Sequence, residues 1–342
     1  MRQRLLSIAF ATLLCANLSG CFSQSGNEKS DIEKKTSTEQ PDTSKYKIVP
    51  YFDPDSAYQF IAMQCAYGPR VPNLKQHDEC GNALQKALEK YGLTTEKQEF
   101  KAKAFDGTTL NGTNIIGRFH AERTNRIVLF SHWDSRPFSD KEKDEANRKK
   151  PVMGANDGAS GVGVLLELAR QTQRVDPGIG VDIVFLDLED YGAPEWANFD
   201  GNDDWCLGSQ YWSLHHNYTS ENRPRMGILL DMVGGENPTF MIDVVSSMFA
   251  NSRAERFWKN AHEFGYRSTF VSGTGGEILD DHYYVNNIAQ IPTFDIIDYR
   301  PGQGFPESWH TQHDDMVHIS KKTLGIVGKV LTRFVYTSCG NN

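Results

Sequence analysis

Acids and histidines stand at several separate places in this chain where a short apolar segment ends or a helix is about to begin. These residues are His132, Asp157, Glu189, Asp190, Asp231, Asp280 and His310. Imidazole nitrogens and carboxylate oxygens are the ligands that catalytic zinc sites use. Burying several carboxylates side by side is costly unless a cation balances their charge. If the fold brings these residues together, the pattern therefore predicts a metal centre.

Each of these residues also has an ordinary structural explanation. Asp157 could cap the helix that follows it. His132 and His310 could be hydrogen-bonded histidines of the core, and the pair Glu189 and Asp190 could belong to a solvated loop. Taken singly, these explanations are the ones we favour. The recurrence of such residues at successive strand ends is what favours metal chemistry.

Apolar patterning predicts the elements that position these residues. The expected helices cover residues 54–64, 76–91, 158–174, 207–215, 250–264 and 321–336. The expected strands cover residues 95–105, 113–119, 127–130, 181–188, 226–233 and 293–297. This alternation predicts an α/β fold, a single-domain α/β/α sandwich with a central, mostly parallel twisted sheet. Such sheets place their chemistry at the carboxyl ends of the strands, so the polar residues are expected to meet at one edge.

The first residues have the pattern of an export signal. Arg2 and Arg4 precede an apolar run, residues 5–14, that is too short to cross a bilayer comfortably. The run leads to Leu-Ser-Gly-Cys, which resembles the bacterial lipobox, so we expect residues 1–20 to be removed and Cys21 to be acylated. An ordinary cleaved signal with an accidental cysteine is the alternative. Acyl chains would hold the protein on a membrane surface, in the periplasm or elsewhere in the cell envelope.

Residues 21–45 are rich in Ser, Lys, Glu, Thr and Gln and have almost no large apolar side chain. Such a segment cannot bury enough surface to fold, and we interpret it as a disordered tether. The remaining residues, 46–342, form the expected catalytic domain.

The net charge of the chain argues against nucleic-acid binding. The formal net charge is −8, and removing residues 1–20, which hold two arginines and no acid, makes it −10. So acidic a protein is a poor nucleic-acid binder.

Four cysteines remain in the expected mature domain, and they allow three disulfide pairings among which the sequence does not choose. They are Cys65, Cys80, Cys206 and Cys339. None has the CxxC spacing of a structural zinc site.

The chain resembles the glutaminyl cyclases that are related to zinc aminopeptidases. The resemblance runs from residues 66–72 to the last predicted helix. It is carried by the motifs SHWDS (131–135), ANDGASG (155–161), VFLDLED (184–190), LLDMVGG (229–235), LDDH (279–282) and FPESWHT (305–311). It implies a zinc exopeptidase-like fold and the closure of an N-terminal glutamine into pyroglutamate, with ammonia released. The expected substrates are peptides or proteins with N-terminal Gln, and we expect a monomer.

The resemblance also implies a role for each site residue. Asp157, Asp190 and His310 would be the ligands of one zinc ion per chain. Glu189 would shuttle the proton, and Asp231 and Asp280 would be acids hydrogen-bonded around it. His132 occupies the position of a second-metal ligand in related two-zinc peptidases. Where the family has paired glutamates this chain has Glu189 and Asp190, so one ligand is a methylene shorter. The expected walls of the substrate pocket are Trp196, Phe305 and Trp309.

Two alternatives remain open at this stage. The first is a two-zinc aminopeptidase on the same fold, in which His132 and Asp231 would bind a second metal bridged by Asp157. Asp280 and Trp309 favour the cyclase, and metal content distinguishes the two enzymes. The second is a metal-free binding protein, which would retain these ligands for no chemical reason.

Overall fold

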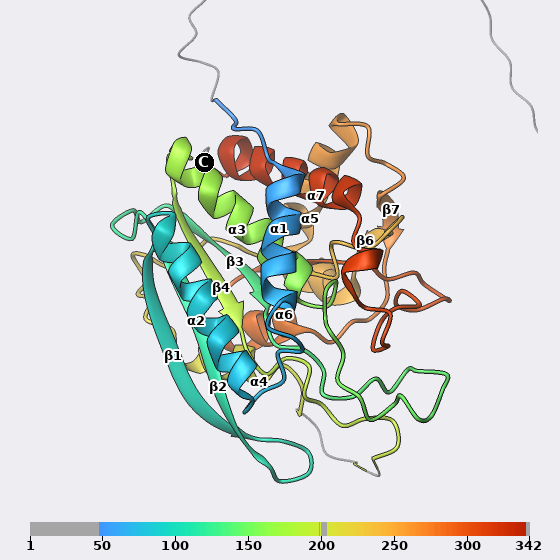
Figure 1. Ribbon diagram of the computed structural model, residues 1–342. Helices are drawn as coiled ribbons and strands as arrows, with labels where there is room; N and C mark the ends of the chain where they lie inside the picture. The colour runs from blue at the N-terminus through green and yellow to red at the C-terminus, as the bar shows by residue number, and fades with distance from the viewer. Residues whose placement is uncertain (1–47, 198, 200–203, 340–342) are drawn as a thin grey trace, which may run out of the picture. The chain divides into compact units, whose positions relative to one another are not determined.

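A six-stranded sheet with the strand order β1-β2-β4-β3-β5-β8 forms the centre of the fold (Figure 1). The computed structural model describes residues 48–197, 199 and 204–339. The strands in this order are β1 (Thr94–Lys103), β2 (Thr109–Phe119), β4 (Gly180–Leu186), β3 (Arg126–His132), β5 (Gly227–Asp231) and β8 (Thr293–Ile297). Strands β4, β3, β5 and β8 run parallel, whereas β1 and β2 are antiparallel additions beside β4. The predicted α/β fold with a mostly parallel sheet is confirmed.

Helices cover both faces of this sheet. One face packs against α1 (Pro54–Cys65), α2 (Lys75–Lys90), α3 (Ala159–Arg174), α5 (Val244–Glu263) and α7 (Lys321–Arg333). The other face packs against α4 (Leu207–His215), α6 (Asp281–Tyr284) and the π-helical turn η2 (Val285–Ala289). Successive residues of one strand point to opposite faces of the sheet, so alternate residues pack in the two different cores. In β3, Leu129 belongs to the first core, whereas Val128 and Phe130 belong to the second.

The remaining elements are short. Strands β6 (Phe240–Ile242) and β7 (Phe270–Thr274) form a separate two-stranded parallel sheet. A 3-10 turn, η3 (Met316–His318), precedes α7, and a π-helical turn, η4 (Phe334–Ser338), follows it. Neither β6 nor β7 was expected, because such short strands show no readable alternation of apolar residues.

Helix α5 begins six positions before its predicted start. Asp243 caps it by accepting a hydrogen bond from the backbone N–H of Ser246 at 2.9 Å. The helix is kinked at Ala250, where φ is −137°. Apolar periodicity breaks at a kink, which explains why the pattern predicted only the part that follows it.

The first turn of α3 lies directly on the ends of the strands. A Cβ atom on Gly158 would lie 2.4 Å from the carbonyl oxygen of His132, and one on Gly161 would lie 2.3 Å from that of Leu230. These separations are far below van der Waals contact, so glycine is required for this approach. The approach places Asp157, which precedes Gly158, beside the end of β3.

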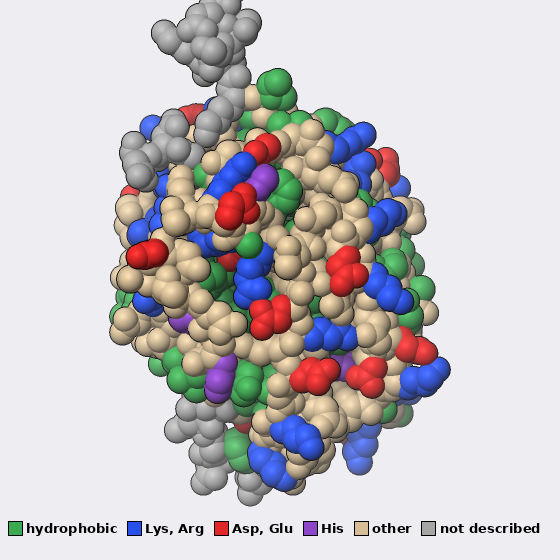
Figure 2. Space-filling model, turned by 90° about the vertical axis from the view of Figure 1, so that its left-hand side faces the viewer, with side chains coloured by type: hydrophobic (Ala, Val, Ile, Leu, Met, Phe, Trp, Pro, Cys, Tyr) green, Lys and Arg blue, Asp and Glu red, His purple; other side chains and the backbone are tan. Residues whose placement is uncertain are grey.

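The surface is charged with both signs. Edge strand β1 carries Lys97, Glu99, Lys101 and Lys103, and charges on an edge strand discourage pairing with other chains. On the face of the molecule in Figure 2, acidic and basic side chains are interspersed. No disulfide joins the cysteines of the described residues.

Within residues 48–339, as far as they are described, no helix is both long and apolar enough to cross a bilayer. The predicted signal peptide, acylated Cys21 and tether lie outside the described residues.

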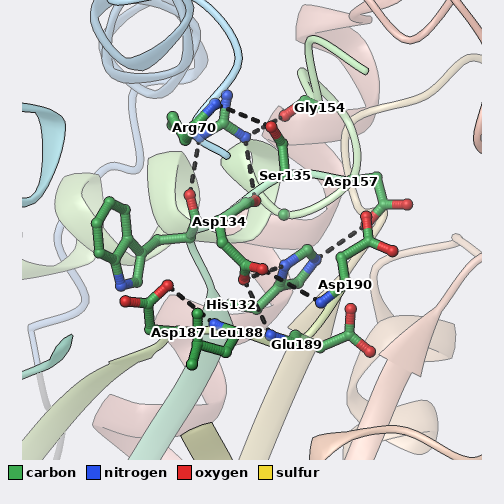
Figure 3. A network of polar contacts seen from close by, with 12 residues as sticks. Arg70, His132, Asp134, Ser135, Gly154, Asp157, Asp187, Leu188, Glu189 and Asp190 are labelled. Carbon is green, nitrogen blue, oxygen red and sulfur yellow. Dashed lines mark hydrogen bonds and ion pairs between the residues drawn. The ribbon is translucent and has the colours of Figure 1, made fainter. Parts of the chain in front are cut away.

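Arg70 is a fully buried residue that ties together the loops around the strand ends (Figure 3). Its Nε donates to the carbonyl oxygen of Trp133 at 2.8 Å. Its Nη1 and Nη2 donate to the carbonyl oxygens of Met153 and Gly154, each at 2.7 Å. One guanidinium thereby satisfies backbone acceptors on two loops that are distant in sequence.

Replacing Arg70 by Met is expected to lower the free energy of unfolding by about 3–5 kcal/mol, because several buried carbonyl groups would lose their donors. Chemical denaturation monitored by circular dichroism measures this change. Arg174→Met is the matched control, since Arg174 is exposed at the end of α3, and it should change stability by no more than about 0.5 kcal/mol. Equal stability of the two variants would contradict the role given to Arg70.

Candidate metal centre and substrate pocket

The carboxyl ends of the parallel strands bring the predicted site residues to one edge of the sheet. His132 ends β3, Asp231 ends β5, and Glu189 and Asp190 follow β4. Three further residues come from loops, and they are Asp157 before α3, Asp280 before α6 and His310 between β8 and η3. A single pocket is lined by six of these seven residues, all except His132.

Asp157, Asp190 and His310 form a compact group of three buried side chains. The Nε2 atom of His310 lies 3.1 Å from Oδ1 of Asp190 and 3.7 Å from Oδ2 of Asp157. One ligand atom from each residue lies within 4.8 Å of the other two. Zinc bonds of 2.0–2.2 Å in a tetrahedral site separate neighbouring ligand atoms by about 3.3 Å, so these separations fit a shared zinc ion.

Two residues that the sequence analysis did not single out support this group. Asp140 lies 3.3 Å from Nδ1 of His310, which directs the opposite ring nitrogen, Nε2, to the centre of the group. Arg136 donates to both Asp140 oxygens at 2.7 Å and lies 3.5 Å from Oδ1 of Asp190. Both side chains are buried. Burial raises the pKa of the Asp190 carboxyl, and the negative charge of Asp157 raises it further. A cation bound between these two carboxylates would relieve this repulsion.

His132 lies in a second group beside the first. Its Nε2 atom is 2.9 Å from Oδ1 of Asp157 and 3.2 Å from Oδ1 of Asp231. Burial alone would lower the pKa of His132, but hydrogen bonds to Asp134, Asp157 and Asp231 raise it well above its usual value. Burial raises the pKa of Asp231 to about 7. In this second group the His132 imidazole and the two carboxyl groups are close enough to share hydrogen bonds.

The Asp134 carboxylate holds the segment that carries Glu189 and Asp190 (Figure 3). Its Oδ1 accepts from the backbone N–H of Glu189 at 3.1 Å, and its Oδ2 accepts from that of Asp190 at 3.2 Å. Its Oδ1 also lies 3.4 Å from Nδ1 of His132. The position of Asp134, two residues after His132 in the SHWDS motif, was the signal that could have identified it.

Glu189 faces the pocket between the first group and Asp280. Its pKa is raised well above the usual value, first by burial and then by the charges of Asp190, Asp280 and Asp281. Burial likewise raises the pKa of Asp280. A carboxyl group in such surroundings is suited to hold a proton and to release it.

Several residues in or beside the site have a strained, left-handed backbone conformation. Leu188, Cys206, Met232 and His310 have φ values of 56°, 56°, 47° and 56°. These non-glycine residues line the pocket or adjoin residues that do. A left-handed conformation of this kind costs about 1–3 kcal/mol per residue and concentrates at functional sites.

The pocket has a volume of about 240 Å³ and is open to solvent on one side. Pockets for drug-sized ligands typically hold roughly 300–1,000 Å³, so this one suits a single small side chain. Its aromatic walls are Trp205, Phe305 and Trp309. The rings of Trp309 and His310 are stacked with centroids 3.8 Å apart, and Phe305 lies 4.4 Å from Trp309.

Trp205, and not Trp196, completes these walls. The Trp205 ring is nearly parallel to that of His310, with centroids 6.1 Å apart, and the Arg136 guanidinium lies 4.6 Å from its centre. Trp196 is 46% exposed and contacts Phe138 edge to face. Trp205 has this position because it comes directly before Cys206 and α4, which return the chain to the end of β4.

Known proteins share this fold and these sequence features. The model of peptidase family M28 matches residues 114–335. The structure of a glutaminyl cyclase from Bacteroides thetaiotaomicron bound to N-acetylhistamine is 47% identical, with a TM-score of 0.82, and the match covers 85% of this chain and 99% of that chain. A Zn-dependent exopeptidase from Parabacteroides distasonis is 45% identical with a TM-score of 0.83, covering 85% of this chain and 100% of that one.

A more distant similarity is to the glutaminyl-peptide cyclotransferase of Boiga dendrophila, which is 24% identical over 251 residues. That match covers 65% of this chain and spans 64% of the length of the curated relative. The resemblance stated from the motifs is confirmed by these similarities, and the chain is an enzyme that belongs to peptidase family M28.

Proposed function

We propose that this enzyme uses one zinc ion to convert the N-terminal glutamine of peptides or proteins into pyroglutamate, with release of ammonia. The observation that carries the proposal is the position of Glu189 beside the group of Asp157, Asp190 and His310, in a pocket sized for one side chain. Similarity to glutaminyl cyclases across nearly the whole folded domain supports it.

Some residues of the pocket hold the substrate, and Glu189 transfers a proton. A zinc ion held by Asp157, Asp190 and His310 would polarise the carbonyl of the glutamine carboxamide. Glu189 takes a proton from the substrate α-amine, whose nitrogen forms a bond to the carboxamide carbon. The bond from this carbon to the amide nitrogen then breaks, and Glu189 returns the proton to that nitrogen, which leaves as ammonia. The aromatic walls exclude water around the closing ring.

A two-zinc aminopeptidase is the second candidate. The observation that favours it is the contact of His132 with both Asp157 and Asp231, since these residues could hold a second ion bridged by Asp157. Asp280 argues for the cyclase, because it places an additional acid beside Glu189. Trp309 does so as well, because it narrows the pocket against the ligand His310.

We also propose that the enzyme is exported and held on a membrane surface of the cell envelope by acyl chains on Cys21. The support is the sequence pattern of residues 1–21 and the polar tether that follows. We expect the catalytic domain to act as a monomer.

Replacing Glu189 by Gln should lower kcat at least about 100-fold, because an amide cannot shuttle a proton. Zinc content should be unchanged, since Glu189 is not part of the group that would bind the ion. Release of ammonia from a Gln-peptide and metal analysis of the same sample measure both quantities. Glu195→Gln is the control, because Glu195 is exposed and pairs with Lys141, and its kcat should remain within twofold of wild type. Substantial activity of Glu189→Gln would exclude Glu189 as the proton shuttle.

Removal of metal should abolish turnover, and one equivalent of zinc per chain should restore it. His310→Ala should lose the ion, because it removes one of three ligands, whereas His318→Ala should retain it, since His318 is half exposed and pairs with Asp315. Metal analysis and activity titration measure both effects. Two zinc ions per chain together with release of free amino acids would instead establish the aminopeptidase.

Trp205→Ala should lower kcat/KM for a Gln-peptide about tenfold, because it removes a large apolar wall of the pocket. Trp196→Ala should change kcat/KM less than twofold, since this side chain is half exposed and lies away from the pocket. Steady-state kinetics with matched zinc content measures the difference. Loss of activity in Trp196→Ala alone would reverse the assignment of the aromatic wall.

A further inference from the structure

Cys206 is a buried residue that the proposed mechanism does not use, and its thiol contacts the carboxylate of Glu189. The Sγ atom lies 3.3 Å from Oε1 of Glu189, and the side chain has no exposed surface. Cys206, Glu189 and Asp280 each have one polar atom within 4.8 Å of the other two. The thiol therefore belongs to the cluster that contains the proton-shuttling group.

The backbone fixes this contact. The N–H of Cys206 donates to the carbonyl oxygen of Glu189 at 2.9 Å, and that of Leu207 donates to the carbonyl oxygen of Leu188 at 2.9 Å. A Cβ atom on Gly208 would lie 2.0 Å from the carbonyl oxygen of Asp187, so the two segments are as close as backbones can come. Both Cys206 and Leu188 adopt left-handed conformations to allow this. The thiol is thus placed against the carboxylate by two paired chain segments.

The thiol is a hydrogen-bond donor in this position. Burial raises the pKa of Cys206 well above its usual value, and the charges of Glu189, Asp281 and Asp280 raise it further. A neutral S–H group can donate to a carboxylate, whereas a thiolate would be repelled by it. Among the described residues, no other side chain donates a hydrogen bond to the Glu189 carboxylate.

We propose that Cys206 is a positioning residue for Glu189, whose S–H group holds Oε1 and leaves Oε2 to exchange the proton with the substrate. The proposal rests on the proposed function of Glu189. A carboxylate that is free to rotate would spend less time in the orientation that the reaction needs, so loss of the donor affects turnover rather than substrate binding.

Kinetics of two variants test the proposal. Cys206→Ala removes the donor and is expected to lower kcat about tenfold, with KM within twofold of wild type and zinc content unchanged. Cys206→Ser restores a donor and is expected to recover most of the lost kcat. Cys80→Ser is the matched control, because Cys80 is equally buried but lies in the core on α2, and its kcat should not change. Wild-type kcat in Cys206→Ala, or equal losses in the alanine and serine variants, would overturn the proposal.

The thiol stretching vibration gives a readout that needs neither turnover nor a folded Cys206 variant. The S–H band absorbs in an infrared window that is free of other protein bands, and it shifts to lower frequency when the thiol donates to a carboxylate. One thiol band is expected to move to higher frequency in Glu189→Ala. An unchanged set of bands would refute the contact itself. If wild type shows no cyclisation while the band shift is present, the proposed function fails and the hydrogen bond stands.

Discussion

Negative charge gathered at one edge of the sheet is the constraint on which the rest of the structure depends. The side chains of Asp157, Asp190, Asp231 and Asp280 are buried there, and that of Glu189 is partly buried. Like charges in a medium of low dielectric repel strongly, so the fold must supply positive charge, protons or a metal ion. The Arg136 guanidinium supplies part of it, and hydrogen bonds of His132 to Asp157 and Asp231 offset a further part. The group around His310 is arranged so that an ion can supply the remainder.

A second set of acids holds the backbone that carries the first set. Asp134 accepts hydrogen bonds from the N–H groups of Glu189 and Asp190, and Asp314 accepts from those of Asn156 and Asp157 at 2.6 and 3.1 Å. Backbone N–H groups stabilise these carboxylates without adding a mobile charge. The side chains that would bind the ion therefore begin from segments that are already fixed. These backbone hydrogen bonds hold the acidic side chains close together even when no cation is bound.

The sequence predicted the elements and the central residues of the site because both leave local patterns. Uninterrupted apolar runs marked strands such as β3 and β4, and an acid or histidine directly after a run marked the active edge. Asp190 was found in this way, and Asp157 and His310 were found through the motifs that contain them; the structure brings the three together. Arg136 and Asp140 were missed, because their roles depend on a loop path that has no periodicity.

The same physical reason explains the error at the aromatic wall. The sequence around Trp196 and Trp205 has no apolar periodicity that distinguishes the two indoles. The hydrogen bonds of Cys206 and Leu207 to the segment after β4 hold the chain next to Trp205 at the pocket. The early start of α5 was missed because a kink at Ala250 separates its first turns from the periodic part. Local patterns fix elements, whereas the contacts between distant loops fix the members of a site.

The ring of His310 has two indole neighbours, with Trp309 stacked on it and Trp205 nearly parallel to it at a larger distance. One side chain, Trp309, consequently belongs both to the aromatic wall of the pocket and to the packing of the His310 imidazole. A smaller residue in place of Trp309 would enlarge the pocket and would also remove the ring stacked on this imidazole. The size of the pocket and the orientation of His310 would therefore change together.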